Sequence, residues 1–347
     1  MGYHMVAVTS PGPELDSLRH DDGFHCVAVP MHRRISPVAD LVSLVRLVIV
    51  MAKERPWVVH SMTPKAGLLC MIAAWLTGVP VRVHTFTGLV WPTATGLKRR
   101  LLMMTDRITC ACATHVIPEG KGVMHDLQHD GITSKPMRVL GHGNVKGVDI
   151  ERFDPSRLGA QAASGAFTFL FVGRIVGEKG INELVEAFAR LHEEQPATRL
   201  VLVGNYETEL DPLSQGTRRI IDAMDAIETL GPKRGDDLVS AYAEADCFVM
   251  PSYREGFPNV VLEAGAMGLP SVVTDINGSR EIVENGKNGL VVPPRDAAAL
   301  YDAMKLMATD NEARQRMARE ARPMIVSRFE RGYVQRCQIE FYKDVMG

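Results

Sequence analysis

The sequence carries little net charge, which argues against a protein dedicated to binding nucleic acid. Its 347 residues include 39 Lys and Arg against 41 Asp and Glu, a formal net charge of −2 at pH 7, whereas nucleic-acid binders carry a clear basic excess. The charge is uneven, because residues 1–155 hold 17 basic against 13 acidic residues and the remainder holds 22 against 28. We therefore expect the first half to face any anionic surface.

The sequence also lacks the cysteine patterns of disulfide-bonded and metal-binding proteins. None of its six cysteines belongs to a CxxC pair or to a metal-ligand grouping, so we expect reduced and mostly buried thiols. A cytoplasmic location is the corresponding prediction. The six residues are Cys26, Cys70, Cys110, Cys112, Cys247 and Cys337.

Long apolar runs are missing as well. The longest, from Ala66 to Val83, is interrupted by Gly78, Pro80 and Arg82, and it predicts a helix, a turn and a strand rather than a membrane span. We expect no secretory signal in the first residues. The length instead favours two domains of ordinary size, each with its own core.

Short β-rich runs alternate with helical segments along most of the chain. This order predicts an α/β protein with parallel sheets covered on both faces, built twice as two Rossmann-like doubly wound domains. Residues 149–165, rich in small and polar side chains, predict the linker. The predicted parts are domains at 1–155 and 156–328 and a final helix at 329–347 that packs back on the first domain. The last strand expected in the first domain is MRVLGHG, residues 137–143.

The segment from Pro251 to Pro270 predicts a helix with an uncapped start. Pro258 suits the first position of a helix and Gly268 marks its end, which gives roughly ten residues. Phe257 stands where a capping side chain would normally accept a hydrogen bond, so the first amides are left for water or a ligand. Such a helix start attracts phosphate.

Two glutamates flank this helix start. Glu255 precedes the helix and Glu263 lies about a turn and a half inside it, and carboxylates suit sugar hydroxyls, which donate hydrogen bonds. The alternative is that Glu255 is a surface loop acid and Glu263 a solvated helix residue. The apolar and small neighbours of Glu263 in VVLEAGAMG predict instead a partly buried carboxylate with a partner. We adopt the functional interpretation.

A basic loop precedes this segment in the second half. It joins the predicted strand at 167–173 to the predicted helix at 181–192 and carries Arg174 and Lys179. Ligands of parallel sheets bind beyond the carboxyl ends of the strands, where these two cations could hold phosphate oxygens. The alternative is that Arg174 and Lys179 are ordinary solvent-exposed residues of a surface loop. We expect the helix start at Pro258 to lie at a neighbouring strand end, so that both features meet one diphosphate.

The two segments together resemble the C-terminal half of the family 4 glycosyltransferases, a retaining group with the two-domain GT-B fold. The motifs are FVGRIVGEKGINELVEAF and PSYREGFPNVVLEAGAMGLP, which contains an E-x7-E pattern. The first half, with HSMTPKAGLL, HTFTGLVWPTATGLKRR and GHGNVKGVDIERFDP, is similar to members that build bacterial capsule, O-antigen or lipid-linked oligosaccharides. The resemblance implies an acceptor-binding first domain and a donor-binding second domain.

The resemblance also implies a role for each matching position. Arg174 and Lys179 match residues that bind the donor diphosphate. Glu255 matches the acid that contacts hydroxyls of the transferred sugar, and Glu263 the acid that holds the ribose. The resemblance implies that His84 lies beside the reacting centre, with a structural role at a strand end as the open alternative. The implied catalytic residues are Glu255, His84, Arg174 and Lys179, and the further donor contacts are Leu230, Gly231, Phe257, Pro258, Asn259 and Val260.

The implied reaction is a retaining transfer of a hexose or related sugar from a nucleotide sugar, which we expect to be UDP-linked. The implied acceptor is a polyprenyl-diphosphate-linked or other glycan in bacterial surface polysaccharide synthesis. We expect no metal and no other cofactor, because no DxD cluster stands in a suitable loop and Arg174 and Lys179 could replace a divalent ion. We expect same-face attack in an ion-pair-like transition state, with Glu255 positioning the sugar.

A basic segment of the first half, GLKRRLLMMTDR, predicts an amphipathic helix that could lie on anionic lipid and present such an acceptor. An ordinary helix with a solvated basic face is the alternative. Contact with the inner face of the cytoplasmic membrane is therefore a second hypothesis about location. The basic residues are Lys98, Arg99, Arg100 and Arg107, beside Leu97, Leu101, Leu102 and Met103.

The chain departs from the family pattern in two places. Family members have a strand, a Gly-rich loop and a helix before the strand that matches GYHMVAVTS. We therefore expect the first domain to lack its first strand, which is usually central to the sheet, and its first helix. The second departure is Lys146, where the family often has Asn; we expect it to change little chemistry. The alternative functions are a nucleotide-sugar epimerase on the same fold and a truncated, non-catalytic protein that only binds nucleotide sugar.

Overall fold

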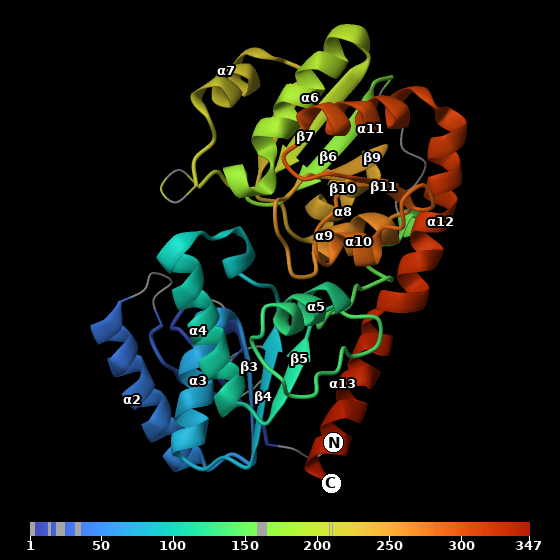
Figure 1. Cartoon of the computed structure of the whole chain (residues 1–347). Coiled ribbons are helices and arrows are strands. Elements are labelled where there is room, and N and C mark those ends of the chain that lie inside the picture. Colours follow the sequence, from blue (N-terminus) through green and yellow to red (C-terminus); the bar gives the residue numbers. More distant parts are fainter. Residues whose placement is uncertain are drawn as a thin grey trace. The chain divides into compact units, whose positions relative to one another are not determined.

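The computed structural model describes residues 4–12, 15–18, 25–31, 36–157, 165–207, 209 and 211–347. The chain divides into two compact units (Figure 1). The first consists of Met1–Pro118, Met124–Arg138 and Val345–Gly347, and the second of Glu119–Val123 and Val139–Asp344. Residues 158–164 of the predicted linker lie outside the described residues.

The first unit is a parallel α/β arrangement, as predicted. Its described strands are β1 (Val6–Thr9), β2 (His25–Ala28), β3 (Val58–Met62), β4 (Val81–Phe86) and β5 (His115–Pro118). Its helices are α2 (Pro37–Glu54), α3 (Pro64–Leu76) and α4 (Gly96–Cys112), and α5 (Lys121–His129) begins among the residues of the second unit. A short 3-10 helix, Trp91–Thr93, precedes α4.

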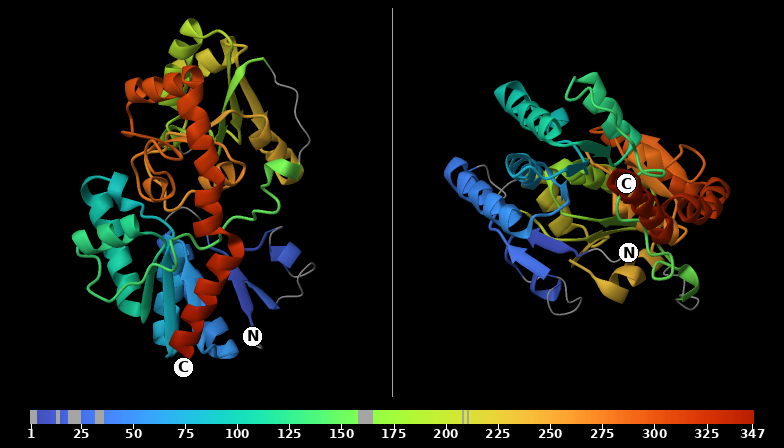
Figure 2. Two further views of the ribbon diagram at one scale, coloured as in Figure 1. Left: turned by 90° about the vertical axis from the view of Figure 1, so that its right-hand side faces the viewer. Right: turned by 90° about the horizontal axis from the view of Figure 1, so that it is seen from below.

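The sheet of the first unit is divided. Among the described strands, β1 pairs with β2, and β3, β4 and β5 form a separate three-stranded sheet. The dark blue pair and the light blue to teal trio can be followed as separate arrows in Figure 2. The lack of a first strand and helix, which the family resemblance led us to expect, stays a prediction.

One hydrophobic core nevertheless serves both sheets. Leu47 of α2 and Ala73 of α3 are fully buried in it, and Val8 of β1 and Val59 of β3 both pack against the same cluster. Helices on one face can therefore hold the two sheets in one unit, although among the described strands no ladder of hydrogen bonds joins one sheet to the other.

The second unit contains an unbroken sheet. Its described strands follow the order β11-β10-β9-β6-β7-β8, and every pair is parallel. The strands are β6 (Phe167–Val172), β7 (Thr198–Val203), β8 (Ile227–Gly231), β9 (Cys247–Met250), β10 (Ser271–Thr274) and β11 (Gly289–Val292). The helices are α6 (Ile181–Glu194), α7 (Gln215–Ala223), α8 (Gly235–Ala243), α9 (Asn259–Ala266), α10 (Ser279–Ile282), α11 (Ala297–Thr309), α12 (Asn311–Phe329) and α13 (Arg331–Met346), with 3-10 turns at Pro155–Arg157 and Gly177–Lys179.

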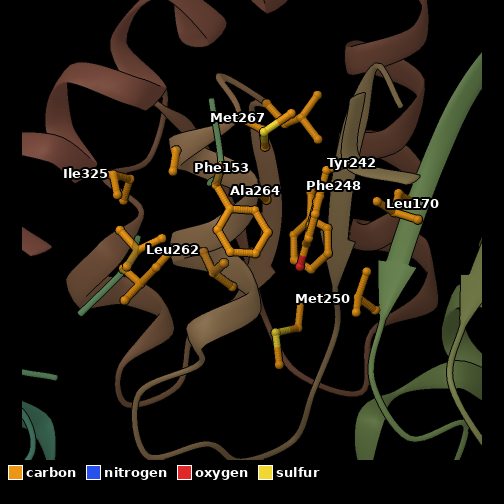
Figure 3. Packing of buried hydrophobic residues seen from close by; sticks show 14 of the residues in the cluster. Phe153, Leu170, Tyr242, Phe248, Met250, Leu262, Ala264, Met267 and Ile325 are labelled. Atoms are coloured by element: carbon orange, nitrogen blue, oxygen red, sulfur yellow. The ribbon is translucent and has the colours of Figure 1, made fainter. Parts of the chain in front are cut away.

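Helices cover both faces of this sheet, because side chains alternate along each buried strand. Phe169 and Phe171 of β6 join one core with Phe188 of α6. Leu170, between them, joins the other core with Phe248 of β9. Figure 3 shows this second core, where Phe153, Tyr242 and Phe248 meet Leu262 and Ile325 from α9 and α12.

The boundary between the units lies earlier than the predicted residue 155. The second unit takes up the chain again at Val139, since the segment that follows pairs with residues far along the chain. Val148 donates a backbone hydrogen bond to Phe329 (2.8 Å) and accepts one from Arg331 (2.9 Å). Phe153 lies in the core of the second unit. The last helix groups with the second unit as far as Asp344, and its predicted packing on the first domain stays a prediction.

The predicted strand at residues 137–143 is wrong. Met137 forms an isolated parallel bridge with Val116, and turns follow it. Glycines explain the difference, because Gly141 and Gly143 have φ of 56° and 98°, values that a strand does not accommodate.

Candidate active site

The predicted site residues of the second unit gather at the carboxyl ends of its two central strands. β6 and β9 are neighbours, with β7 and β8 on one side and β10 and β11 on the other. The chain therefore reverses its direction of strand addition between β6 and β9, and such a switch point is where open parallel sheets bind ligands. Arg174 and Lys179 follow β6, and Glu255 follows β9.

A glycine brings the two loops together. Gly180 ends the turn before α6 with φ of 70°, and a Cβ at this position would overlap the carbonyl oxygen of Pro251. The loop after β6 can therefore lie against the end of β9 only with glycine here. A backbone hydrogen bond from Tyr253 to Glu178 (2.9 Å) joins the same two loops.

This approach places Lys179 and Glu255 in direct contact. The Nζ atom of Lys179 donates a hydrogen bond to Oε1 of Glu255, and their side chains are only 15% and 16% exposed. Mostly buried charges are normally paired, because a buried charge without a partner is costly. The prediction that the basic loop and the glutamate segment lie at neighbouring strand ends is confirmed for these two residues.

Arg174 lies in the same loop but contacts other carboxylates. Its guanidinium donates to Oε2 of Glu207 and to Oε1 of Glu178, both at 2.6 Å. Glu178 also accepts from Arg254 at 2.8 Å. A phosphate arriving at Arg174 would therefore share or displace carboxylate partners, which sequence reasoning did not foresee.

The helix start is shifted by one residue from its predicted position. The helix α9 runs over the eight residues Asn259–Ala266, with Pro258 at the cap position (φ −74°, ψ 107°), whereas the sequence suggested Pro258 as the first of about ten helical residues. The main inference is unchanged, because proline has no side-chain acceptor for the first amides. The Phe257 ring is buried against Phe329 (centroids 5.3 Å apart), which anchors the turn.

Asn259 and Val260 form the first turn of α9. The amide side chain of Asn259 accepts a hydrogen bond from Nδ2 of Asn144 (3.0 Å), so a loop preceding the linker is tied to this helix start. The carbonyl of Val260 lies 3.3 Å from the hydroxyl of Tyr242. Both residues thus belong to the region that the resemblance assigns to the donor.

Glu263 is held by a tyrosine that sequence reasoning missed. The fully buried Tyr242 of α8 donates its hydroxyl to Oε2 of Glu263 at 3.0 Å. Burial raises the pKa of Glu263, and the Tyr242 hydroxyl with the charges of Lys146 and Arg152 opposes that rise. The predicted buried carboxylate with a partner is confirmed. Lys146, expected to change little chemistry, acts electrostatically on this carboxylate.

A third carboxyl group near these residues was also missed. Glu119 is 5% exposed. Its backbone carbonyl accepts a hydrogen bond from the backbone N–H of Asn144 (2.9 Å). Burial raises the pKa of Glu119 to about 8; a hydrogen bond from the Val145 backbone opposes the rise, and the charges of Glu281 and Glu255 add to it. A protonated carboxyl group can donate a hydrogen bond as well as accept one. The signal in the sequence was an acid directly after a buried strand.

Two further predicted residues lie two strands away from β6, on the far side of β7. Leu230 and Gly231 end β8, and the carbonyl of Gly231 accepts a hydrogen bond from Gly204 (2.9 Å), just after β7. Gly231 has φ of 64°. Both are half-buried, at the same edge of the sheet as Arg174.

His84 belongs to the first unit and is described by itself. Its side chain is 1% exposed at β4, and its Nδ1 shares a hydrogen bond with the hydroxyl of Ser61 (2.8 Å). A Cβ on Gly67 of α3 would overlap the imidazole ring. Burial lowers the pKa of His84 to about 3, with a further contribution from His60, so the ring is neutral at physiological pH. Both the catalytic and the structural interpretations stay open.

The basic segment predicted as amphipathic forms α4. Arg99 is paired with Asp130 (2.8 Å), while Lys98, Arg100 and Arg107 are exposed. Over the part of the chain that the structure describes, no helix combines the length and apolar character that crossing a membrane requires. The same residues include no cluster of three or more His, Cys, Asp or Glu arranged to hold a metal ion.

Comparison with known proteins identifies the class to which this fold and site belong. Residues 157–324 match the family described as glycosyl transferases group 1, and residues 1–143 match the glycosyl transferase 4-like domain. The chain is 30% identical over 335 residues to the capsular polysaccharide biosynthesis glycosyltransferase CapM of Staphylococcus aureus. The matched stretch covers 95% of this chain and 86% of the relative. The chain therefore belongs to the family 4 glycosyltransferases of GT-B fold.

A second relative and two solved structures agree. An α-1,3-galactosyltransferase of Escherichia coli, named for transfer from UDP-Gal to α-D-GlcNAc-diphosphoundecaprenol, is 31% identical over 335 residues, covering 92% of this chain and 83% of the relative. The fold matches Anabaena HepE in complex with UDP (TM-score 0.79, 18% identity, 98% and 92% coverage). It also matches sucrose-phosphate synthase from Thermosynechococcus elongatus (TM-score 0.81, 21% identity, 99% and 90% coverage).

Proposed function

We propose that this glycosyltransferase moves a hexose or related sugar from a UDP-linked donor to a polyprenyl-diphosphate-linked glycan, with retention of the anomeric configuration. The observation that carries the proposal is the contact of Lys179 with Glu255 at the switch point of the second sheet. It joins a cation suited to a leaving diphosphate with an acid suited to sugar hydroxyls. The names of the Staphylococcus and Escherichia relatives support the acceptor class.

The proposed chemistry is electrostatic. Lys179, Arg174 and the amides at the start of α9 would stabilise the negative charge that develops as the diphosphate departs, since preorganised donors of this kind reduce the barrier by several kcal/mol. Glu255 would orient and polarise the donor sugar through its hydroxyls, without attacking the ring. The acceptor hydroxyl would then approach on the face that the diphosphate leaves, which retains the configuration. The reaction would need no metal.

Glu263 would hold the donor's ribose, with Tyr242 fixing the carboxylate. A ribose offers two hydroxyl donors to a carboxylate, and the buried Tyr242 hydroxyl occupies one oxygen of Glu263. Leu230 and Gly231 would border the base. His84 would act beside the reacting centre as a neutral group, consistent with its lowered pKa.

The proposed place of action is the cytoplasmic side of the membrane. A polyprenyl-linked acceptor resides in the bilayer, and the exposed basic residues of α4, Lys98, Arg100 and Arg107, suit anionic headgroups. Peripheral contact through this helix is part of the proposal.

The function can be tested with purified protein and a panel of nucleotide sugars. Nucleotide release is measured with and without a polyprenyl-diphosphate-linked acceptor, and the product linkage is assigned by NMR. We expect acceptor-dependent release of UDP and an unchanged anomeric configuration. Release that needs no acceptor, with an altered sugar recovered, would favour the epimerase; inversion would refute the retaining mechanism.

The variant Lys179→Ala tests the phosphate role of this lysine. Its matched control is Lys305→Ala, because Lys305 also pairs with a glutamate (Glu194, 2.6 Å) but both side chains of that pair are exposed. We expect Lys179→Ala to lower kcat/KM at least about 100-fold and Lys305→Ala to leave it unchanged. Equal turnover in the two variants would refute the phosphate role.

A second candidate function is binding of nucleotide sugar without turnover. The separation of β1 and β2 from the other described strands of the first unit favours it, since a separate two-stranded sheet is less rigid. Calorimetric binding of UDP by a protein that releases no nucleotide with any acceptor would support this candidate over the transferase.

A further inference from the structure

Large exposed apolar side chains are concentrated in the first unit. Among the described residues of the second unit, the most exposed are Leu306 (37%) and Ile339 (36%). In the first unit, Leu97 reaches 81% and Val38 reaches 78%. Scattered exposed apolar residues are normal on a soluble protein, whereas a contiguous group marks an interaction surface.

The helix α2 (Pro37–Glu54) carries a ridge of such residues from Val38 to Ile49. They recur at intervals of three and four, which places them on one face of the helix. The opposite face of α2 packs into the core of the first unit. A helix that is apolar on both faces normally lies between two apolar neighbours. The ridge consists of Val38, Leu41, Val42, Val45 and Ile49, all at least 46% exposed.

The helix α4 shows a second row on its outer face, mixed with basic side chains. The row follows the same helical spacing. The single acidic residue within α4, Asp106, points inward, where its Oδ2 accepts from the indole of Trp91 (3.0 Å). The outer face of α4 is thus apolar and basic. Its apolar residues are Leu97, Leu101, Met104 and Ile108, and its exposed basic residues are Lys98, Arg100 and Arg107.

The helix α3 joins these two faces, because it packs against both α2 and α4 (Figure 1). Its last turn exposes Trp75 and Leu76, each at 57%, and Trp57, shortly after the end of α2, is 62% exposed. Tryptophan is the residue most typical of the boundary between headgroups and acyl chains.

We propose that the outer faces of α2, α3 and α4 form a docking surface for anionic lipid. The aliphatic ridge of α2 enters the boundary between headgroups and acyl chains, and the basic residues of α4 hold the headgroups. This surface deepens the proposed function, because it extends the contact from one basic helix to three helices and assigns the apolar share of the binding to α2.

Charge argues for lipid rather than for a second copy of the chain. A self-association surface would bring Lys98, Arg100 and Arg107 of both copies to one interface, and like charges there are unfavourable. Anionic headgroups supply the opposite charge, and each basic residue near the surface adds to the attraction. Buried aliphatic area adds to this attraction.

The test is flotation of the native protein with vesicles of phosphatidylcholine, with and without phosphatidylglycerol. The α2 variant is Val45→Glu with Ile49→Glu, and the control is Leu306→Glu with Ile339→Glu, which places the same charges on the exposed apolar positions of the second unit. We expect the α2 variant to partition at least about tenfold less onto both kinds of vesicle, as loss of buried apolar area demands, and the control to partition as the native protein does.

A second variant, Lys98→Gln with Arg100→Gln and Arg107→Gln, separates charge from apolar burial. We expect it to lose the preference for phosphatidylglycerol and the sensitivity to salt while keeping the residual binding to phosphatidylcholine. Unchanged partition of the α2 variant would overturn the proposal. So would a native dimer in sedimentation that dissociates in the α2 variant without change in vesicle binding.

Circular dichroism verifies that each variant folds. Because UDP binding is measured separately, failure of docking is distinguishable from failure of the donor site.

Discussion

The two units use the same kinds of element for different ends. The second unit has one unbroken parallel sheet, covered on both faces, with its charged residues gathered where β6 and β9 end. In the first unit the described strands form two separate sheets, and exposed apolar residues lie on α2, on the last turn of α3 and, beside basic residues, on α4. A polar donor requires side chains fixed by a closely packed frame, whereas a lipid surface requires exposed apolar area with a basic fringe. The comparison therefore agrees with the proposed donor site in the second unit and with the proposed lipid-docking surface in the first.

The largest expected contrast concerns local stability. The pair β1 and β2 forms a two-stranded sheet, while β6 is central in six strands. Because small sheets open at a lower free energy than central strands, amides of β1 and β2 should exchange with deuterium at least about 1,000-fold faster than those of β6. Hydrogen exchange followed by mass spectrometry measures this. Similar protection in the two units would remove the contrast.

The next effect sharpens the role of the second unit in chemistry. Arg174→Ala should lower kcat/KM about 100-fold or more, because it removes a charge that would stabilise the leaving diphosphate. Arg199→Ala is a matched control, since Arg199 is also paired with a glutamate (Glu228, 2.6 Å). Steady-state kinetics measure both variants. A wild-type rate for Arg174→Ala would limit the donor cations to Lys179, and differential scanning calorimetry should show little change in Tm for either.

The units should also respond to pH in opposite directions. Burial lowers the pKa of His60 to about 4 and that of His84 to about 3. Unfolded histidine takes up a proton below about pH 6.5, so the first unit loses stability as the pH falls from there toward 4. Burial raises the pKa of Glu119 to about 8, so its contribution is full below about pH 4.5 and is lost as the pH rises through 8.

Each group changes the unfolding free energy by at most about 1.4 kcal/mol per pH unit. Calorimetry between pH 4 and pH 9 measures both trends. UDP, which we propose binds the second unit, should raise the Tm of that unit and so identify its transition. Glu119→Gln should abolish the alkaline loss in that transition. An alkaline loss of the same size in Glu119→Gln would show that another group causes it.

The smallest effect concerns the positioning of Glu263. Tyr242→Phe removes one buried hydroxyl and leaves the ring in its core. We expect UDP to bind about 3- to 10-fold more weakly, in line with about 1 kcal/mol for a buried hydrogen bond. Tyr301→Phe is the control, since Tyr301 is also buried and donates to Glu194 (2.6 Å) far from the site. Calorimetric titration measures both, and equal affinities would show that Tyr242 serves packing alone.

Much of the second unit could be predicted from the sequence. Its strands are apolar runs between turn residues, and its site follows from loops at strand ends, a rule that fixes which residues share an edge. The helix start was displaced by one residue, because proline fits both the cap position and the first helical position. Tyr242 escaped notice, since an apolar helix face gives no sign of where one hydroxyl points.

The first unit was less predictable. The alternation of elements alone does not tell which strands pair, so the separation of β1 and β2 from β3, β4 and β5 among the described strands could not be predicted. The strand expected at residues 137–143 does not form, because two glycines with positive φ turn the chain there. The exposed ridge on α2 could not be predicted either. Composition shows that a helix is apolar, but it does not show which of its faces pack against the rest of the protein.

The sequence by itself determined the alternating α/β order, the family and the candidate carboxylates and cations of the second unit, because these are local patterns of periodicity, turn residues and motif spacing. Only the tertiary structure decided that Lys179 meets Glu255, that Tyr242 holds Glu263, and that Glu119 is buried beside charged neighbours. Such contacts join residues far apart along the chain. They depend on strand order and on close approaches such as that of Gly180 to Pro251. Neither can be deduced from the sequence of a single segment.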